Sequence, residues 1–101
     1  MQNIRIIVED ERHKELSQSD INFADVLNTV WETTNKDKYP WIWSIDPYGL
    51  TLFNLNQVPY LKLELKKLSK DLNEEGQEIV KKLLTFIEKV EQHKYLVFIG
   101  D

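Results

Sequence analysis

Hydrophobic residues recur along the chain with two periods, one typical of strands and one typical of helices. Four short segments rich in β-branched and aromatic residues predict strands, at residues 4–8, 41–45, 50–55 and 95–99. Three longer segments repeat apolar residues every three or four positions and predict helices, at residues 22–33, 57–72 and 74–93. The stretch from Glu9 to Ser19 is polar, and we expect it to be a loop.

The second and third predicted strands are joined by residues 46–49, with the sequence DPYG, which is typical of a tight turn. Proline favours the second position of such turns and glycine the fourth, while aspartate suits the first. We therefore predict a β-hairpin over residues 41–55. Within its first strand, alternation would place Trp41 and Trp43 on the same face.

Together these elements predict a single domain over residues 1–101 with the order β-α-β-β-α-α-β. A four-stranded, mostly antiparallel sheet with the helices packed on it would bury the apolar strands and all three helical stripes. The predicted fold class is therefore α+β. We expect the first and last strands in the centre of the sheet and the hairpin toward one edge.

Composition and charge narrow the functional classes. The chain has 101 residues, a net charge of −4 and no cysteine, which excludes disulfides and thiolate chemistry. The first residues lack the pattern of a signal peptide, and the longest apolar run is too short to span a bilayer. We therefore expect a cytoplasmic protein with no membrane partner. The acidic balance also disfavours nucleic acid, because phosphate binding needs a basic surface.

No segment carries a recognisable catalytic motif. The two histidines, His13 and His93, are too few for a metal site without carboxylates at a suitable spacing, and a triad around His13 would rest on nearby loop serines alone. Residues 71–76 begin like a calcium-binding loop, but Lys82 stands where such a loop needs a bidentate glutamate. A turn followed by an acidic helix start explains the same residues. We expect no catalytic residue, no metal and no cofactor.

Two groups of residues are candidates for binding a protein partner. The first is an acidic cluster after the first predicted strand, made of Glu9, Asp10, Glu11 and Glu15. It would dock a basic partner if it acts in binding, and would otherwise serve only solubility. The second group is aromatic: Trp43 and Tyr48 lie beside the predicted turn and would act as anchors if they are exposed at an interface. Core and turn packing is the other interpretation of these aromatics.

Residues 40–54 and 95–101 resemble a set of small bacterial proteins that have no assigned activity. The shared features are the DPYG turn followed by Phe53 and Asn54, and a terminal strand ending in the sequence FIGD. This resemblance implies a common fold. In size, acidity and lack of catalytic motifs, the chain also resembles bacterial immunity proteins, including those of contact-dependent growth inhibition, which neutralise nucleases and other toxins.

The resemblance to immunity proteins implies a cytosolic inhibitor that binds a cognate toxin and covers its active site. An acidic inhibitor facing a basic toxin would associate quickly by electrostatic steering. The expected contact residues are Glu9, Asp10, Glu11, Glu15, Trp43 and Tyr48. The alternative is a small enzyme or ligand-binding domain with a pocket beside the hairpin, lined by Asp46, Tyr48, Asn54 and Asp101. The sequence leaves the toxin, the oligomeric state and the strand order open.

Overall fold

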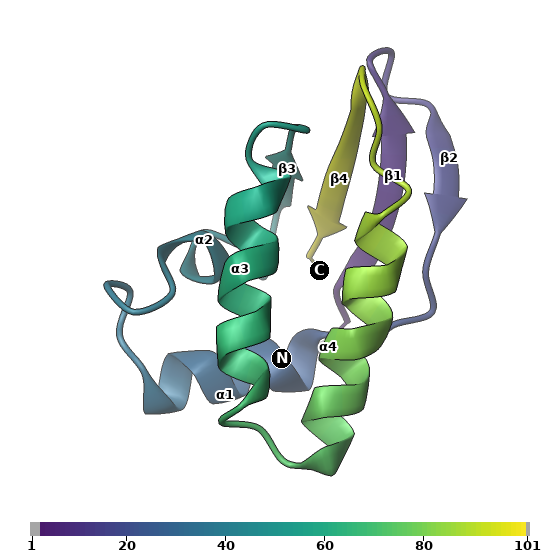
Figure 1. The fold of residues 1–101 in the computed structure, drawn as a ribbon. Coiled ribbons are helices and arrows are strands. Elements are labelled where there is room, and N and C mark those ends of the chain that lie inside the picture. Colours follow the sequence, from purple (N-terminus) through teal and green to yellow (C-terminus); the bar gives the residue numbers. More distant parts are fainter. Residues whose placement is uncertain (1–2, 101) are drawn as a thin grey trace.

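The structure, a computed structural model, describes residues 3–100. Within this range the chain forms four strands and four helices (Figure 1). In chain order they are β1 (Arg5–Asp10), β2 (Glu15–Gln18), α1 (Ala24–Thr33), α2 (Pro40–Trp43), β3 (Leu50–Phe53), α3 (Val58–Ser69), α4 (Glu74–Ile87) and β4 (Lys94–Ile99).

The four strands form one antiparallel sheet in the order β2-β1-β4-β3. The central strands β1 and β4 pair along their whole length, from Arg5 opposite Ile99 to Asp10 opposite Lys94. The long helices α3 and α4 lie side by side in front of the sheet, and α1 crosses below them (Figure 1). The predicted α+β class and the central position of the first and last strands are both confirmed.

Alternation along β1 and β4 divides their side chains between the two faces of the sheet. Ile6 and Phe98, which lie opposite each other in the register, belong to the main core that the helices cover. Ile7 and Val97 are also buried, but alternation directs them to the other face, and they lie outside that core cluster. The sheet therefore has a helix-covered face and a second face, which we call the open face.

Local capping explains where α4 begins. Its N-cap is Asn73, whose Oδ1 accepts the N–H of Gly76 at 2.8 Å. Glu74 and Glu75 occupy the first turn, where acidic side chains stabilise the helix dipole. This is the turn and acidic helix start that the sequence offers as the alternative to a calcium loop. The three long helices all lie inside their predicted ranges, and each is shorter than predicted.

The loop predicted from Glu9 to Ser19 is wrong, because this segment completes β1 and then forms β2. Its tight turn is held by Asp10, whose Oδ1 accepts the N–H groups of Arg12 and Lys14, each at 2.9 Å. The strand β2 pairs antiparallel to β1 along one side only. Its side chains are mostly exposed, so it lacks the apolar alternation from which a strand is recognised.

The strand predicted over residues 41–45 is also wrong, because Pro40–Trp43 forms the short helix α2. Pro40 occupies the first turn, where its missing N–H is tolerated. The carboxylate of Glu64, on α3, accepts the N–H groups of Trp41 and Ile42 at 3.0 Å each and so caps α2 from another helix. This tertiary contact overrides the strand propensity of the tryptophans and isoleucines.

The DPYG turn connects α2 to β3 and does not close a hairpin. The Oδ1 atom of Asp46 accepts the N–H of Tyr48 at 2.9 Å. The carbonyl of Gly49 accepts the N–H of Gly100 at 2.8 Å, which ties the turn to the end of β4. A Cβ atom on Gly100 would lie 2.2 Å from the carbonyl oxygen of Pro47, so this close approach requires glycine.

Candidate protein-binding site

The four acids of the predicted docking cluster lie on the hairpin of β1 and β2. Glu9 and Asp10 end β1, Glu11 lies in the turn and Glu15 begins β2. The hydrogen bond from the Lys14 N–H is the main reason that the pKa of Asp10 is lowered, and the Arg12 N–H lowers it further. Asp10 therefore organises the turn as well as carrying charge.

The other three acids of this cluster contact basic side chains. The pairs are Glu15 with Arg5 at 3.0 Å, Glu9 with His13 at 3.3 Å and Glu11 with His93 at 3.7 Å. Two further basic residues lie in the same turn, so residues 5–18 carry four acids and three Lys or Arg side chains, a formal charge of −1. The acidic field of this hairpin is weaker than four adjacent acids alone would produce.

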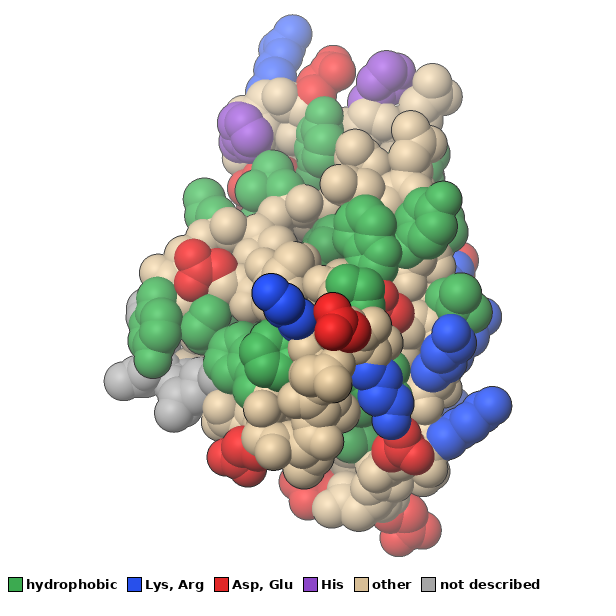
Figure 2. Space-filling view, turned by 90° about the vertical axis from the view of Figure 1, so that its left-hand side faces the viewer, with side chains coloured by type: hydrophobic (Ala, Val, Ile, Leu, Met, Phe, Trp, Pro, Cys, Tyr) green, Lys and Arg blue, Asp and Glu red, His purple; other side chains and the backbone are tan. Residues whose placement is uncertain are grey.

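Both histidines lie at one end of the molecule, where Figure 2 shows two purple side chains. His13 is in the turn between β1 and β2, and His93 is in the turn before β4. Each adopts a φ of 64°, in the left-handed region. Across residues 3–100 there is no group of three or more His, Cys, Asp or Glu side chains that could hold a metal ion.

Trp43 belongs to an aromatic cluster around α2. Its ring centroid lies 6.3 Å from that of Trp31, and its Nε1–H donates to Oγ1 of Thr34 at 3.1 Å. Beside it, Trp41 stacks on Tyr60 of α3, with the centroids 5.4 Å apart. Because Trp43 is half-buried, it packs α2 against α1 and leaves only part of its ring accessible to a partner.

Tyr48 is far more accessible, with 74% of its surface exposed. It precedes β3, in which Leu50 and Leu52 are 64% and 38% exposed. Alternation directs both leucines to the open face, away from Phe53, which is buried in the core. Leu52 pairs with Val97 of β4, so the exposed leucines continue into the buried centre of this face. We call Tyr48, Leu50 and Leu52 the β3 strip.

The structure does not bring the acidic cluster and Tyr48 together. Asp10 pairs with Lys94 at the start of β4, whereas Leu50 pairs with Ile99 at its end. These two ends are separated by the length of a six-residue strand, about 20 Å. The six predicted contact residues thus do not form one compact patch, and a partner that contacts all of them would have to span the sheet.

The pocket proposed beside the hairpin would need side chains that the structure uses in local turns. Asp46 accepts the N–H of Tyr48 before β3. After β3, Asn54 Oδ1 accepts the N–H of Gln57 at 3.0 Å, and Gln57 Oε1 accepts the N–H of Asn54 at 2.9 Å. Asp46 and Asn54 thus lie at opposite ends of β3. The fourth predicted lining residue, Asp101, lies outside the described residues.

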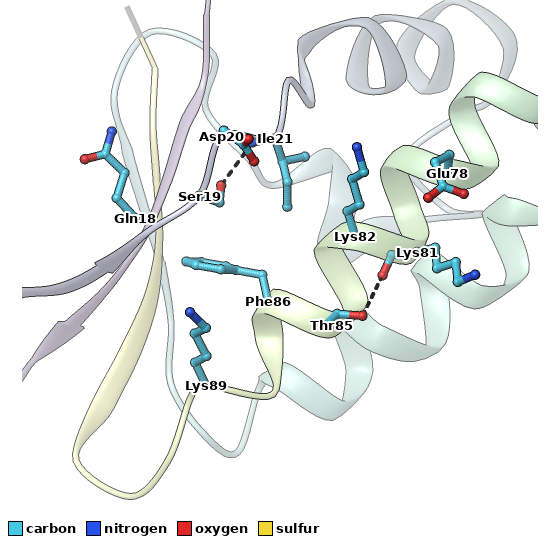
Figure 3. Close-up of a pocket in the computed structure, with 10 residues that line it drawn as sticks. All are labelled: Gln18, Ser19, Asp20, Ile21, Glu78, Lys81, Lys82, Thr85, Phe86 and Lys89. Carbon is cyan, nitrogen blue, oxygen red and sulfur yellow. Dashed lines mark hydrogen bonds between the residues drawn. The ribbon is translucent and has the colours of Figure 1, made fainter.

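A groove of about 700 Å³ lies elsewhere, between α4 and the segment that connects β2 to α1 (Figure 3). One wall is formed by Gln18, Ser19, Asp20 and Ile21, and the other by Glu78, Lys81, Lys82, Thr85, Phe86 and Lys89. The Phe86 ring projects from α4 toward the opposite wall. The Nζ atom of Lys89 lies 5.4 Å from the centre of that ring. Three lysines and two acids therefore line the groove, with a small apolar surface between them.

Two features of these surfaces are not evident from the sequence: the buried Glu64, which caps α2, and the lysines of the groove. Glu64 interrupts the apolar stripe of α3 between Leu61 and Leu65, and a charge at such a position signals a buried partner. It is 8% exposed and caps α2. The lysines of the groove had no comparable signal, because on sequence they are the ordinary polar face of an amphipathic helix.

Comparison of the chain with family models, with curated proteins and with solved structures finds no match. In the part of the chain that the structure describes, no helix has the length and apolar character needed to cross a membrane.

Proposed function

We propose that the chain is a cytosolic protein-binding domain that neutralises a cognate toxin, as immunity proteins do, and that the β3 strip forms part of its contact surface. The observation that carries this proposal is the exposure of Tyr48, Leu50 and Leu52 in one short run at the edge of the sheet. Tyrosine is among the residues that supply most of the binding free energy of protein interfaces, and the exposed leucines beside it add apolar contact area.

The edge position strengthens the argument for a protein partner. β3 is the outermost strand on its side of the sheet, and its four residues include no charged side chain. Edge strands of soluble proteins commonly carry charges that discourage pairing with other chains. An uncharged edge beside exposed apolar side chains favours a surface that a partner covers. Figure 2 views this side of the molecule and shows hydrophobic side chains gathered across it.

The acidic hairpin has a secondary role in this proposal. Glu15 already pairs with Arg5, and Arg12 and Lys14 lie in the same turn, so a partner gains less from these acids than from an isolated acidic cluster. The chain still carries a net charge of −4, which attracts a basic toxin at long range. The hairpin therefore contributes to the rate of association, and the β3 strip to the lifetime of the complex.

The test is a growth assay with a matched pair of variants. The chain is co-expressed with the toxic product of the neighbouring gene, as wild type, as Tyr48→Ser/Leu50→Ser/Leu52→Ser, and as the control Leu16→Ser/Leu63→Ser. The control removes two exposed leucines from β2 and α3, outside the strip. We expect the wild type and the control to protect the cells, and the strip variant to fail because its complex dissociates at least about tenfold faster.

Two measurements make the outcome decisive. Thermal unfolding of each purified variant checks that loss of protection is not loss of the fold. Biolayer interferometry against the same gene product gives the dissociation rates. If the strip variant is folded, protects the cells and dissociates at the wild-type rate, the strip is not the contact surface. If the wild type neither binds nor protects against any neighbouring product, the immunity function is wrong.

A further inference from the structure

The groove between α4 and the segment after β2 concentrates positive charge in an acidic chain. Lys82 projects from α4 and Lys89 from the turn that follows it, on either side of Phe86 (Figure 3). Among the ion pairs of residues 3–100, none involves either lysine within 4.0 Å. Both ammonium groups are therefore available to an external carboxylate, in a chain whose net charge is −4.

The groove also offers apolar surface between these charges. Phe86 and Ile21 line it from opposite walls; Phe86 is only 7% exposed and belongs to the core, so Ile21, which is partly buried, supplies most of the accessible apolar surface. Lys89 lies over the Phe86 ring, a position that leaves its ammonium near the groove. The groove is open along its length and does not enclose a cavity (Figure 3). A long, thin occupant with acidic and aliphatic side chains fits this surface better than a compact small molecule.

One wall of the groove continues an edge strand with unpaired backbone groups. β2 is the outermost strand on its side of the sheet. The N–H of Ser19 donates to the carbonyl of Ile6 at 3.0 Å, so the backbone of Ser19 faces β1. In an antiparallel pair the N–H and C=O groups alternate in direction, so those of Gln18 point away from β1. An added strand could therefore pair with the free edge at Gln18.

We propose that this groove binds an extended acidic peptide segment of a partner protein, which adds a strand to the edge of β2 and places its carboxylates on Lys82 and Lys89. Lys82 is on α4 and Lys89 is in the turn after it, seven residues further along the chain, which at the helical rise per residue corresponds to about 10 Å. An extended segment covers this distance in about three residues, so acids two to four residues apart reach both lysines. Strand addition supplies backbone hydrogen bonds, and the lysines and Ile21 select the side chains.

Features of the groove favour a peptide over a nucleic acid. Asp20 and Glu78 also line it, and a carboxylate on each wall repels a continuous row of phosphates. A peptide that places acids only opposite the lysines avoids this repulsion, and only a peptide can pair with the β2 edge. This site lies at the opposite edge of the sheet from the β3 strip, so it goes beyond the proposed function and does not depend on it.

The experiment uses a defined probe, an acetylated and amidated octapeptide of alternating Glu and Val that carries a fluorescent label. Fluorescence anisotropy with the full chain measures its Kd, and NMR shift mapping locates it. A second probe has the same sequence with methyl groups on alternate backbone nitrogens, which keeps the charge but removes strand pairing. We expect the first probe to shift residues 18–21 and 82–89, and the methylated probe to bind at least tenfold more weakly.

Variants of the protein test how much Lys82 and Lys89 contribute to binding of the probe. Lys82→Glu/Lys89→Glu should weaken binding of the unmethylated probe at least tenfold. The matched control Lys36→Glu/Lys67→Glu changes the net charge equally at two exposed positions outside the groove and should leave the Kd within about twofold. Melting curves confirm that both variants are folded, and the growth assay of the proposed function is independent of this result.

Four outcomes overturn the proposal. One is the absence of binding at millimolar probe, and another is equal binding of the methylated probe. The third is an equal loss of affinity in the groove variant and the control, which would reduce the effect to net charge. The fourth is that a twelve-residue oligothymidylate binds the groove at least as tightly as the peptide, because the site would then be a general polyanion site.

Discussion

The two edges of the sheet differ in how they are protected from other chains. β2 carries Glu15, and its pairing with β1 contains a bulge between Val8 and Glu9. Charges and bulges are features by which soluble proteins discourage pairing at an edge. β3 has no charged residue, its four residues pair with β4 in one continuous register, and it exposes Leu50 and Leu52. This difference is consistent with the proposed apolar contact at β3, and it means that the proposed pairing at β2 depends on the lysines of the groove.

The two edges also depend on different parts of the chain. The edge at β2 is local, because Asp10 holds the turn that returns the chain to β1. The edge at β3 depends on contacts that are distant in the sequence. Glu64 caps α2, which precedes β3, and the N–H of Gly100 donates to the carbonyl of Gly49 in the turn before β3. We therefore expect mutations that disturb distant contacts to damage the β3 edge more than local changes damage the β2 edge.

The largest effect should come from Gly100→Ala. The new Cβ would lie 2.2 Å from the carbonyl oxygen of Pro47, and backbone atoms must move to relieve the clash. We expect the free energy of unfolding, measured with urea, to fall by about 3 kcal/mol. Gly49→Ala is the control, because its Cβ would meet only the side chain of Asp46 and its φ is not positive. An equal loss in both variants would mean that the close approach does not hold this edge.

Glu64→Ala should have the next largest effect. It removes the acceptor of the Trp41 and Ile42 N–H groups and leaves the buried Ile42 N–H and the part-buried Trp41 N–H without this partner, at a cost of about 2 kcal/mol in the free energy of unfolding. Glu64→Gln keeps one acceptor oxygen and should lose less. Hydrogen exchange should quicken around α2 and β3 while β2 stays as in the wild type. Equal protection loss at both edges would contradict their separate construction.

The role of Glu64 also shows why the sequence predicts the fold class but not every helix and strand. The central strands and the three long helices are predictable, because their buried residues recur with the period of a strand or a helix. Ile6 and Val8 on β1 are examples. The helical conformation at the start of residues 41–45 depends on the carboxylate of Glu64, which lies on a different helix. The local sequence pattern does not reveal that contact. β2 is hidden for another reason, since an exposed edge strand needs no apolar face.

The candidate sites also include features that the sequence shows and features that depend on tertiary contacts. The sequence singles out Tyr48 as a possible anchor beside the turn without deciding between packing and exposure, and the structure leaves it largely exposed. It does not reveal that His13 and His93 lie beside Glu9 and Glu11, because these contacts form only when the turns fold. The groove is invisible in the sequence, since it arises only when α4 lies beside the end of β2.

Neutralising the acidic hairpin should have a smaller effect, on kinetics alone. The variant Glu9→Gln/Asp10→Asn/Glu11→Gln/Glu15→Gln changes the formal net charge from −4 to 0. We expect association with a basic toxin to slow by about threefold and its salt dependence to flatten, while the dissociation rate is unchanged. Stopped-flow binding at several salt concentrations measures this. An unchanged rate and salt slope would leave the cluster a role in solubility only.

The smallest effect concerns acid stability at the β2 edge. Hydrogen bonds from the Lys14 and Arg12 N–H groups lower the pKa of Asp10 in the folded chain below its ordinary value of 3.8. A carboxylate whose pKa is lowered on folding contributes stability above its unfolded pKa and loses that contribution as the pH falls through the folded pKa. Asp10 therefore stabilises the fold at neutral pH and ceases to do so as the pH drops below about 4.

Asp10→Asn removes this titration while keeping an oxygen that accepts the same N–H groups. The variant should melt slightly below the wild type at pH 7, and the difference should shrink as the pH falls from 5 to 2. Melting curves across this range measure the difference, with Asp37→Asn as the control at an exposed turn position. A gap that stays constant or widens on acidification would show that the charge of Asp10 does not stabilise the turn, and that the β2 edge is held by its backbone pairing alone.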